Sequence, residues 1–260
     1  MVDNRSLGRT VHFYNALSPD DALGGLILNQ SITEKNFLFM LEILIVASDP
    51  YSVSLRGSGE VLTQSDAPLK PGQYDIRSNA PEEASITRVY SGAGSGRTEK
   101  FRNQVRERDR KGLWFGFEAA HVFPLADGQL FGDSGLSRWI TNREGEHGSG
   151  INSCQNGFLM QSNIHQEFDS FSFSINPDDN YKVISFDDPF RIDGRVLDPN
   201  CRATNNEGGV RDELLRWHFR QAVLGNMRGA DMQWAGSSKK DGGGAVLKLD
   251  GLSWQKGLSH

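Results

Sequence analysis

The stretches NSCQNGFLMQSNIHQEFD (residues 152–169) and EAAHVFP (residues 118–124) predict two short strands followed by one helix. The earlier stretch alternates as a strand does and ends at a proline. In the later one, Asn-Gly at 156–157 is a strong turn signal, and the FLM after it is typical of a short strand. Ser162 is a suitable N-cap for the helix that follows.

Two polar side chains share one face of this predicted helix. His165 and Asp169 are four residues apart, which places them about 6 Å from each other on a helix surface. An imidazole and a carboxylate at this separation can bind one cation together. His121 lies on the first strand among apolar residues. A histidine in that position is compatible with a hydrogen-bonded core residue as well as with a catalytic group.

The order His121, Asn156, His165, Asp169 resembles the HNH endonuclease family, whose ββα-metal fold surrounds a single metal ion. The residues of the motif are similar to those of the family branch that is common as a stand-alone domain in fungal proteins. The resemblance implies that His121 is the general base that activates water and that Asn156 positions it. It also implies that His165 and Asp169 are the metal ligands. We expect His121 to face that pair.

These roles imply metal-dependent hydrolysis of phosphodiester bonds in nucleic acid, with DNA favoured over RNA. Imidazole has the pKa needed to deprotonate water near neutral pH, and a cation neutralises charge that develops on the phosphate. One histidine and one carboxylate leave positions open for water and phosphate. This mixed nitrogen and oxygen set suits one divalent metal ion, and Mg²⁺, Mn²⁺, Ni²⁺ and Zn²⁺ are all compatible with it.

The sequence departs from the family pattern at two places. Ala120 stands where many members have an Asp or His ligand, although Glu118 shares its face and could replace it. A short strand of the type C-x-[VI]-T-G is also missing before EAAH. An alternative function is therefore a catalytically degenerate HNH-fold protein that acts as a nucleic-acid or protein-binding module. A third hypothesis for the function is a structural or protein-interaction protein without nucleic-acid contacts.

A basic segment precedes the hairpin. Residues 97–111, RTEKFRNQVRERDRK, carry seven Lys or Arg against three acidic residues. The segment is compatible with a solvated, salt-bridged helix. Its position directly before the candidate site equally favours phosphate contacts through Arg102, Arg106 and Arg110.

The chain is expected to be α+β, with a small N-terminal α+β unit over residues 1–96 whose role the sequence does not indicate. A capping box at Ser31 and Glu34 predicts a helix, and strands at 51–55, 59–63, 72–76 and 85–90 predict an antiparallel meander. The HNH-like domain is expected over 97–229 and includes a long helix at 211–227. Residues 230–260 are rich in Gly, Ser and Lys and are expected to be a flexible tail.

Composition limits the remaining classes. The 260 residues include two cysteines and carry a net charge of −5, so a disulfide framework is not expected and nucleic acid must be bound by a local basic patch. The sequence contains no run of eighteen apolar residues, so no membrane span is predicted. We expect an intracellular protein of the nucleus or cytoplasm, and the sequence does not indicate its oligomeric state.

Overall fold

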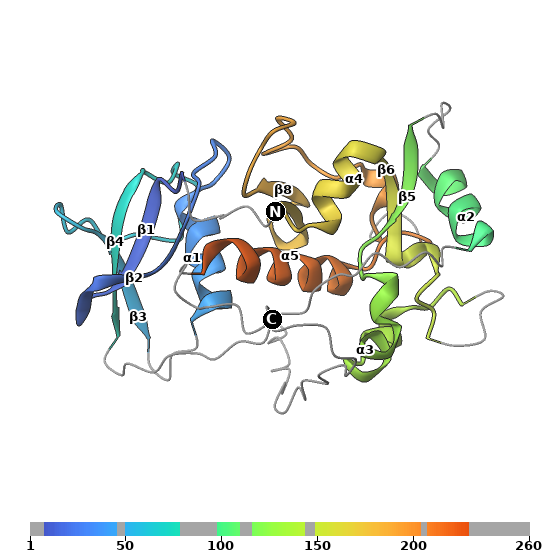
Figure 1. Cartoon of the computed structure of the whole chain (residues 1–260), viewed down its shortest axis with the longest axis horizontal. Coiled ribbons are helices and arrows are strands. Elements are labelled where there is room, and N and C mark those ends of the chain that lie inside the picture. Colours follow the sequence, from blue (N-terminus) through green and yellow to red (C-terminus); the bar gives the residue numbers. More distant parts are fainter. Residues whose placement is uncertain are drawn as a thin grey trace, which may run out of the picture.

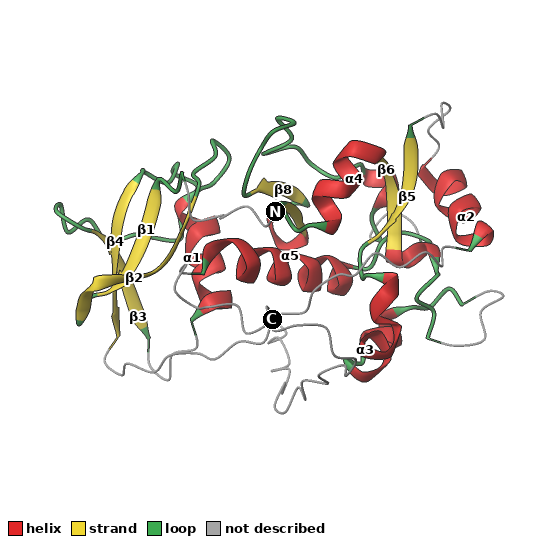
Figure 2. Cartoon of the chain, in the orientation of Figure 1, coloured by secondary structure: helices red, strands yellow, loops and turns green. Residues whose placement is uncertain are grey.

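The computed structural model describes residues 8–45, 50–78, 98–109, 116–143, 149–203 and 207–228. Its helices and strands are mixed along the chain, which confirms the predicted α+β class (Figures 1 and 2). Three features that the sequence suggested lie outside these ranges: the strand at 85–90, the phosphate contact of Arg110 and the tail at 230–260.

The N-terminal sheet has four strands in the order β2-β1-β4-β3. Their bounds are β1 Val11–Asn15, β2 Ser18–Leu26, β3 Tyr51–Leu55 and β4 Gly72–Ser78. The predicted antiparallel meander is confirmed for the strands at 51–55 and 72–76, because β3 and β4 pair antiparallel. It is wrong for residues 59–63, which contribute only a bridge from Val61 to Ser54, and β4 pairs in parallel with β1 on its other side. The first six residues of β2 are exposed and only Leu23 among them is large and apolar, so no alternating pattern predicted that strand.

Helix α1, Glu34–Leu44, covers this sheet. Its N-cap is Thr33, whose side chain accepts a hydrogen bond from the backbone N–H of Asn36, and the side chain of Asn36 accepts in return from Thr33. The capping box predicted at Ser31 is therefore placed two residues too early, since the backbone N–H of Ser31 donates to Asp193 instead. Phe37, Met40 and Leu41 pack into the N-terminal core.

The predicted hairpin and helix are β5 Phe117–His121, β6 Gly157–Gln161 and α4 Ser162–Asp169. The two strands pair antiparallel, with His121 directly opposite Gly157. Helices cover both faces of this hairpin (Figure 1). On one face, Ala119 and Leu159 pack against Phe101 and Val105 of α2, Glu99–Asp109. On the other, Ala120, Phe158 and Met160 pack in a core with Phe168 of α4.

Short elements connect the hairpin strands and continue the domain. Between β5 and β6 lie α3, Gly128–Asp133, and the 3₁₀ helices η1 Leu125–Asp127, η2 Leu136–Trp139 and η3 Cys154–Asn156. After α4, a second antiparallel hairpin joins β7, Phe173–Asn176, to β8, Lys182–Ser185, through η4, Pro177–Asp179. A final 3₁₀ helix, η5, spans Pro199–Cys201.

Helix α5, Asp212–Met227, joins the two cores. Leu214 and Leu215 in its first half are buried with the hairpin elements. Phe219, Val223 and Met227 in its second half are buried in the N-terminal core. In the described part of the chain, no helix combines the length and the apolar composition that crossing a bilayer needs.

Polar contacts also tie the N-terminal unit to the rest of the chain. The Asn36 side chain donates to Asp179 over 2.9 Å and accepts from Nζ of Lys182 over 2.8 Å. Nη2 of Arg9 donates to the carbonyl oxygens of Asn226 and Arg228 at the end of α5. The two units therefore share a hydrophobic core and a hydrogen-bond network.

His218 on α5 is a buried structural residue. Its Nδ1 lies 2.8 Å from Oγ of Ser174, and its ring stacks on Phe168 with centroids 3.7 Å apart. Burial lowers the pKa of His218 from 6.5 to about 3, against smaller opposing effects of the Phe168 carbonyl and of Asp169. The ring is therefore neutral in the folded protein at ordinary pH.

The free energy of unfolding should therefore depend on the protonation of His218. Because the folded pKa is depressed, the unfolded chain binds this proton first, and stability is lost as pH falls from 6.5 toward about 3. Between pH 6.5 and about pH 5 the loss from this residue is expected to be about 2 kcal/mol. Urea unfolding of wild type and His218→Gln over this range measures it, since the neutral variant lacks this pH dependence. Equal pH dependence in both proteins would contradict the assignment.

Candidate active site

The predicted metal pair comes together on α4. Nε2 of His165 lies 3.3 Å from Oδ2 of Asp169, one helical turn further along. The His165 side chain is 4% exposed, whereas that of Asp169 is 52% exposed. Phe168 between them points into the core and is fully buried. The imidazole is thus fixed by packing, and its Nε2 edge meets a carboxylate that reaches solvent.

A second carboxylate contacts the opposite edge of the same imidazole. Nδ1 of His165 lies 2.7 Å from Oε2 of Glu118, which is on β5 and whose side chain is 45% exposed. His165 is thus held between an acidic residue of the hairpin and one of its own helix. Glu118 shares the face of Ala120, and this alternation was the only sequence signal that could have placed it here.

Asn156 links the segment just after β5 to the segment just before β6 by hydrogen bonds. Its Oδ1 accepts from the backbone N–H of Phe123 over 2.8 Å, and its Nδ2 donates to the carbonyl oxygens of Phe123 and Ile151. Its own carbonyl accepts from Val122. The residue is fully buried. These contacts fix the backbone that follows His121.

His121 lies on the other face of the hairpin from His165. Its ring stacks on Phe101 of α2, with centroids 3.9 Å apart and an interplanar angle of 14°, and the residue is 6% exposed. Glu118, which contacts His165, is three residues earlier, so its side chain points to the opposite face and is displaced by about 10 Å along β5. The structure therefore brings His165 and Asp169 together but does not place His121 against them.

A glycine follows Asn156 for a steric reason. A Cβ atom on Gly157 would lie 2.4 Å from the carbonyl oxygen of Ala120 and 2.5 Å from the ring of Phe101. Only a residue without a side chain allows the strands and α2 to approach so closely. Gly157 and Phe101 together define the packed face on which His121 lies.

A buried ion pair that the sequence analysis did not identify supports this region. Arg108 donates through Nε to Oδ1 of Asp109 over 2.6 Å, and their side chains are 4% and 0% exposed. Its Nη atoms donate to the carbonyl oxygens of Cys154, Gly157 and Gly208. Asp109 accepts from the backbone N–H of Leu159. The pair connects α2 to both sides of Asn156.

The donor set fits a divalent cation held by two protein ligands. Nε2 of His165 and Oδ2 of Asp169 converge from one face of α4, and the exposure of Asp169 leaves room for water or phosphate. Among the described residues, no group of three or more His, Cys, Asp or Glu side chains could hold a metal ion. Cys154 and Cys201 are buried free thiols whose pKa values are raised by burial.

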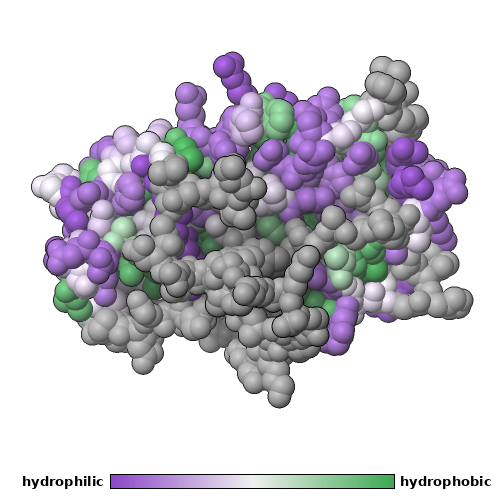
Figure 3. Space-filling model, in the orientation of Figure 1, coloured by the Kyte–Doolittle hydropathy of each residue, from purple (hydrophilic) through white to green (hydrophobic). Residues whose placement is uncertain are grey.

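The predicted phosphate-binding arginines lie on α2. Arg102 is exposed and Arg106 is partly buried, and Arg110 follows the described helix. Hydrophilic residues cover the surface at the end of the molecule where α2 lies (Figure 3). Because α2 and α4 pack on opposite faces of the hairpin, these arginines are not adjacent to the His165–Asp169 pair.

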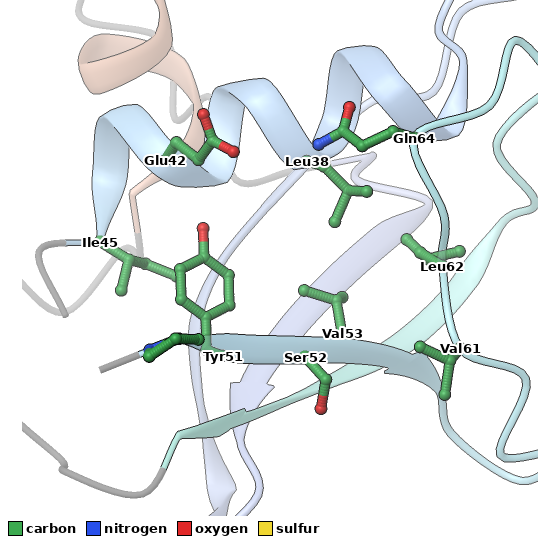
Figure 4. Close-up of a pocket in the computed structure, with 10 residues that line it drawn as sticks. Leu38, Glu42, Ile45, Tyr51, Ser52, Val53, Val61, Leu62 and Gln64 are labelled. Atoms are coloured by element: carbon green, nitrogen blue, oxygen red, sulfur yellow. The ribbon is translucent and has the colours of Figure 1, made fainter. Parts of the chain in front are cut away.

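A separate pocket of about 680 Å³ lies in the N-terminal unit between α1 and β3 (Figure 4). It is lined largely by apolar side chains, with the Tyr51 hydroxyl near Glu42. Burial, and to a lesser degree the charge of Glu42, raises the pKa of Tyr51 to about 12. The lining residues include one carboxylate and no histidine or cysteine, so this pocket does not resemble a hydrolytic centre.

Comparison with known families agrees with the geometry of the hairpin and α4. Residues 93–176 match the family described as HNH endonuclease, which supports an HNH endonuclease domain in this part of the chain. The matched residues include the candidate base, the positioning asparagine and the metal pair. Residues 8–83 match a domain of unknown function, DUF8573. No curated protein and no solved structure matches the chain.

Proposed function

We propose that the protein is a divalent-metal-dependent nuclease that cleaves phosphodiester bonds in nucleic acid, with DNA favoured over RNA. The observation that carries this proposal is the His165–Asp169 pair, whose Nε2 and Oδ2 atoms converge at 3.3 Å within an HNH endonuclease domain. A cation bound there would neutralise negative charge that develops on the phosphate during hydrolysis. His165 supplies a nitrogen ligand and Asp169 an oxygen ligand.

Asn156 and His121 have the remaining roles, positioning and proton abstraction. Asn156 holds the backbone after β5, so the position of His121 is set by hydrogen bonds rather than by a mobile loop. His121 is the candidate base that takes the proton from water. To do so its ring must leave the stack on Phe101 and turn toward the end of the hairpin, because the stacked ring is almost fully buried.

The test is a nicking assay on supercoiled plasmid with the purified full chain and Mg²⁺ or Mn²⁺. We expect cleavage that stops when a chelator removes the metal and that is absent in His165→Gln, which lacks the imidazole ligand. Glu167→Ala on the same helix is the matched control and should cleave as wild type does. Cleavage that persists in chelator, or equally in His165→Gln, would contradict the proposal.

A second function has its own supporting observations. Ala120 replaces a residue that is a ligand in many HNH sites, and His121 packs on Phe101 instead of facing the metal pair. Both favour a degenerate domain that binds nucleic acid or protein without cleaving. The same plasmid then shows retarded migration without nicking in any metal. Retardation should weaken with salt and in Arg102→Ala, but not in Arg77→Ala on the N-terminal sheet.

A further inference from the structure

The imidazole of His165 has an acidic oxygen at each ring nitrogen. Glu118 Oε2 lies 2.7 Å from Nδ1, and Asp169 Oδ2 lies 3.3 Å from Nε2. An ionised carboxylate only accepts hydrogen bonds, and a neutral imidazole carries one N–H. A neutral His165 can therefore donate to only one of the two carboxylates.

The distances decide which nitrogen carries that hydrogen. At 2.7 Å the contact with Glu118 has the length of a charge-assisted N–H···O bond, whereas 3.3 Å to Asp169 is longer than such bonds. With the hydrogen on Nδ1, the lone pair of Nε2 faces an anionic oxygen of Asp169. These two electron-rich atoms, Nε2 and Oδ2, repel each other in the absence of a cation. A cation bound at this edge of the ring would be coordinated by both and would remove the repulsion.

We propose that Glu118 is a positioning residue that holds His165 in the Nδ1–H tautomer and thereby directs Nε2, with Asp169, toward a divalent cation. A histidine ligand commonly donates its other N–H to a carboxylate, which fixes the ring and raises its basicity. This role deepens the proposed function and rests on it for the identity of the metal ligands.

Glu118 does not act as a third ligand in this arrangement. The two nitrogens of an imidazole point to different sides of the ring, so an ion at Nε2 is out of reach of the carboxylate at Nδ1. Glu118 and Asp169 each contact His165, but at opposite edges of its ring. For this reason the described residues contain no group of three ligands around one position. It also corrects the expectation that Glu118 could replace the ligand missing at Ala120.

The scaffold favours such a role because Glu118 is held by a paired strand. Its backbone lies in the β5–β6 ladder opposite Met160, and β6 leads directly into α4, which carries His165. The His165 side chain is 4% exposed, so packing leaves its ring little freedom. Strand, carboxylate and ring therefore form one rigid unit that ends at Nε2.

The first measurement is made on the metal-free full chain by nitrogen-detected NMR of its histidine rings at mildly alkaline pH. The His165 resonances are assigned as those missing in His165→Gln. We expect a hydrogen on Nδ1 and none on Nε2 in wild type and in Glu118→Gln, whose amide oxygen still accepts. In Glu118→Ala the ring should shift toward the other tautomer. A wild-type ring with hydrogen on Nε2, or on both nitrogens, would overturn the proposal.

The second measurement is the affinity for Co²⁺ alone, followed by its visible absorption. Glu118→Ala should bind about 10- to 100-fold more weakly than wild type, whereas Glu118→Gln should lose less. The control Glu167→Ala also removes one negative charge, in this case from α4, without touching His165. This variant should bind Co²⁺ as wild type does. Equal affinity in wild type and Glu118→Ala overturns the proposal, even when the plasmid is cleaved.

The two measurements separate failure of this inference from failure of the proposed function. If wild type neither binds Co²⁺ nor cleaves plasmid, but its ring carries the hydrogen on Nδ1 and loses it in Glu118→Ala, the nuclease proposal fails while the tautomer assignment stands. If Co²⁺ binding needs His165 and Asp169 but not Glu118, the nuclease proposal stands and the positioning role is overturned.

Discussion

Arg108→Ala is expected to lower the free energy of unfolding by about 3–5 kcal/mol. The substitution leaves the Asp109 carboxylate buried without its ion-pair partner and removes the donor to the carbonyl oxygens of Cys154, Gly157 and Gly208. Two of these carbonyls flank Asn156, so the loop that positions His121 should loosen as well. Urea unfolding, followed by circular dichroism, measures the loss.

Exposed Arg102 on the same helix provides the matched control, since Arg102→Ala should change the unfolding free energy by no more than about 0.5 kcal/mol. Asp109→Asn in the Arg108→Met background should restore part of the loss, because the unpaired charge is then absent. A loss below about 1 kcal/mol in Arg108→Ala would show that this pair does not hold α2 against the hairpin.

His121→Ala is expected to reduce the rate of plasmid cleavage by about 10²- to 10⁴-fold, the usual contribution of a positioned general base. Activity in the presence of saturating metal is compared with wild type. Metal binding should persist, because His121 lies on the opposite face of the hairpin from His165 and Asp169. Loss of cleavage with unchanged Co²⁺ affinity would therefore distinguish a base from a ligand.

Because His121 is buried against Phe101, its removal could also loosen the fold. The variant is therefore compared with Phe101→Leu, which weakens the same aromatic stack but keeps the imidazole. Thermal unfolding of both variants is recorded beside the cleavage rates. Similar rates in His121→Ala and Phe101→Leu at similar stability would mean that His121 serves packing, and its assignment as the base would be wrong.

Local pattern predicted the strands β5 and β6, α4 and the juxtaposition of His165 with Asp169, because each depends on residues close in sequence. The turn at 156–157, the strand alternation around Ala120 and the four-residue spacing on a helix are all short-range properties. Helix α5 was predicted for the same reason.

Features that depend on distant partners could not be predicted in this way. The parallel pairing of β1 with β4 joins residues separated by two strands and a helix, and β2 carries no apolar alternation. The alternation of β5 correctly separated His121 from Ala120, but it did not reveal that α2 covers the face of His121. The contact of Glu118 with His165 likewise required the relative position of strand and helix.

The way α5 divides its side chains between two cores has a consequence for synthesis on the ribosome. The N-terminal sheet and α1 emerge early, yet Phe219, Val223 and Met227, which complete their core, are made near the end of the described chain. Until then part of the apolar surface of the sheet and α1 stays uncovered, the condition under which unfinished chains aggregate or engage chaperones. Folding of the N-terminal core should therefore wait for helix α5, whose arrival is the committing step.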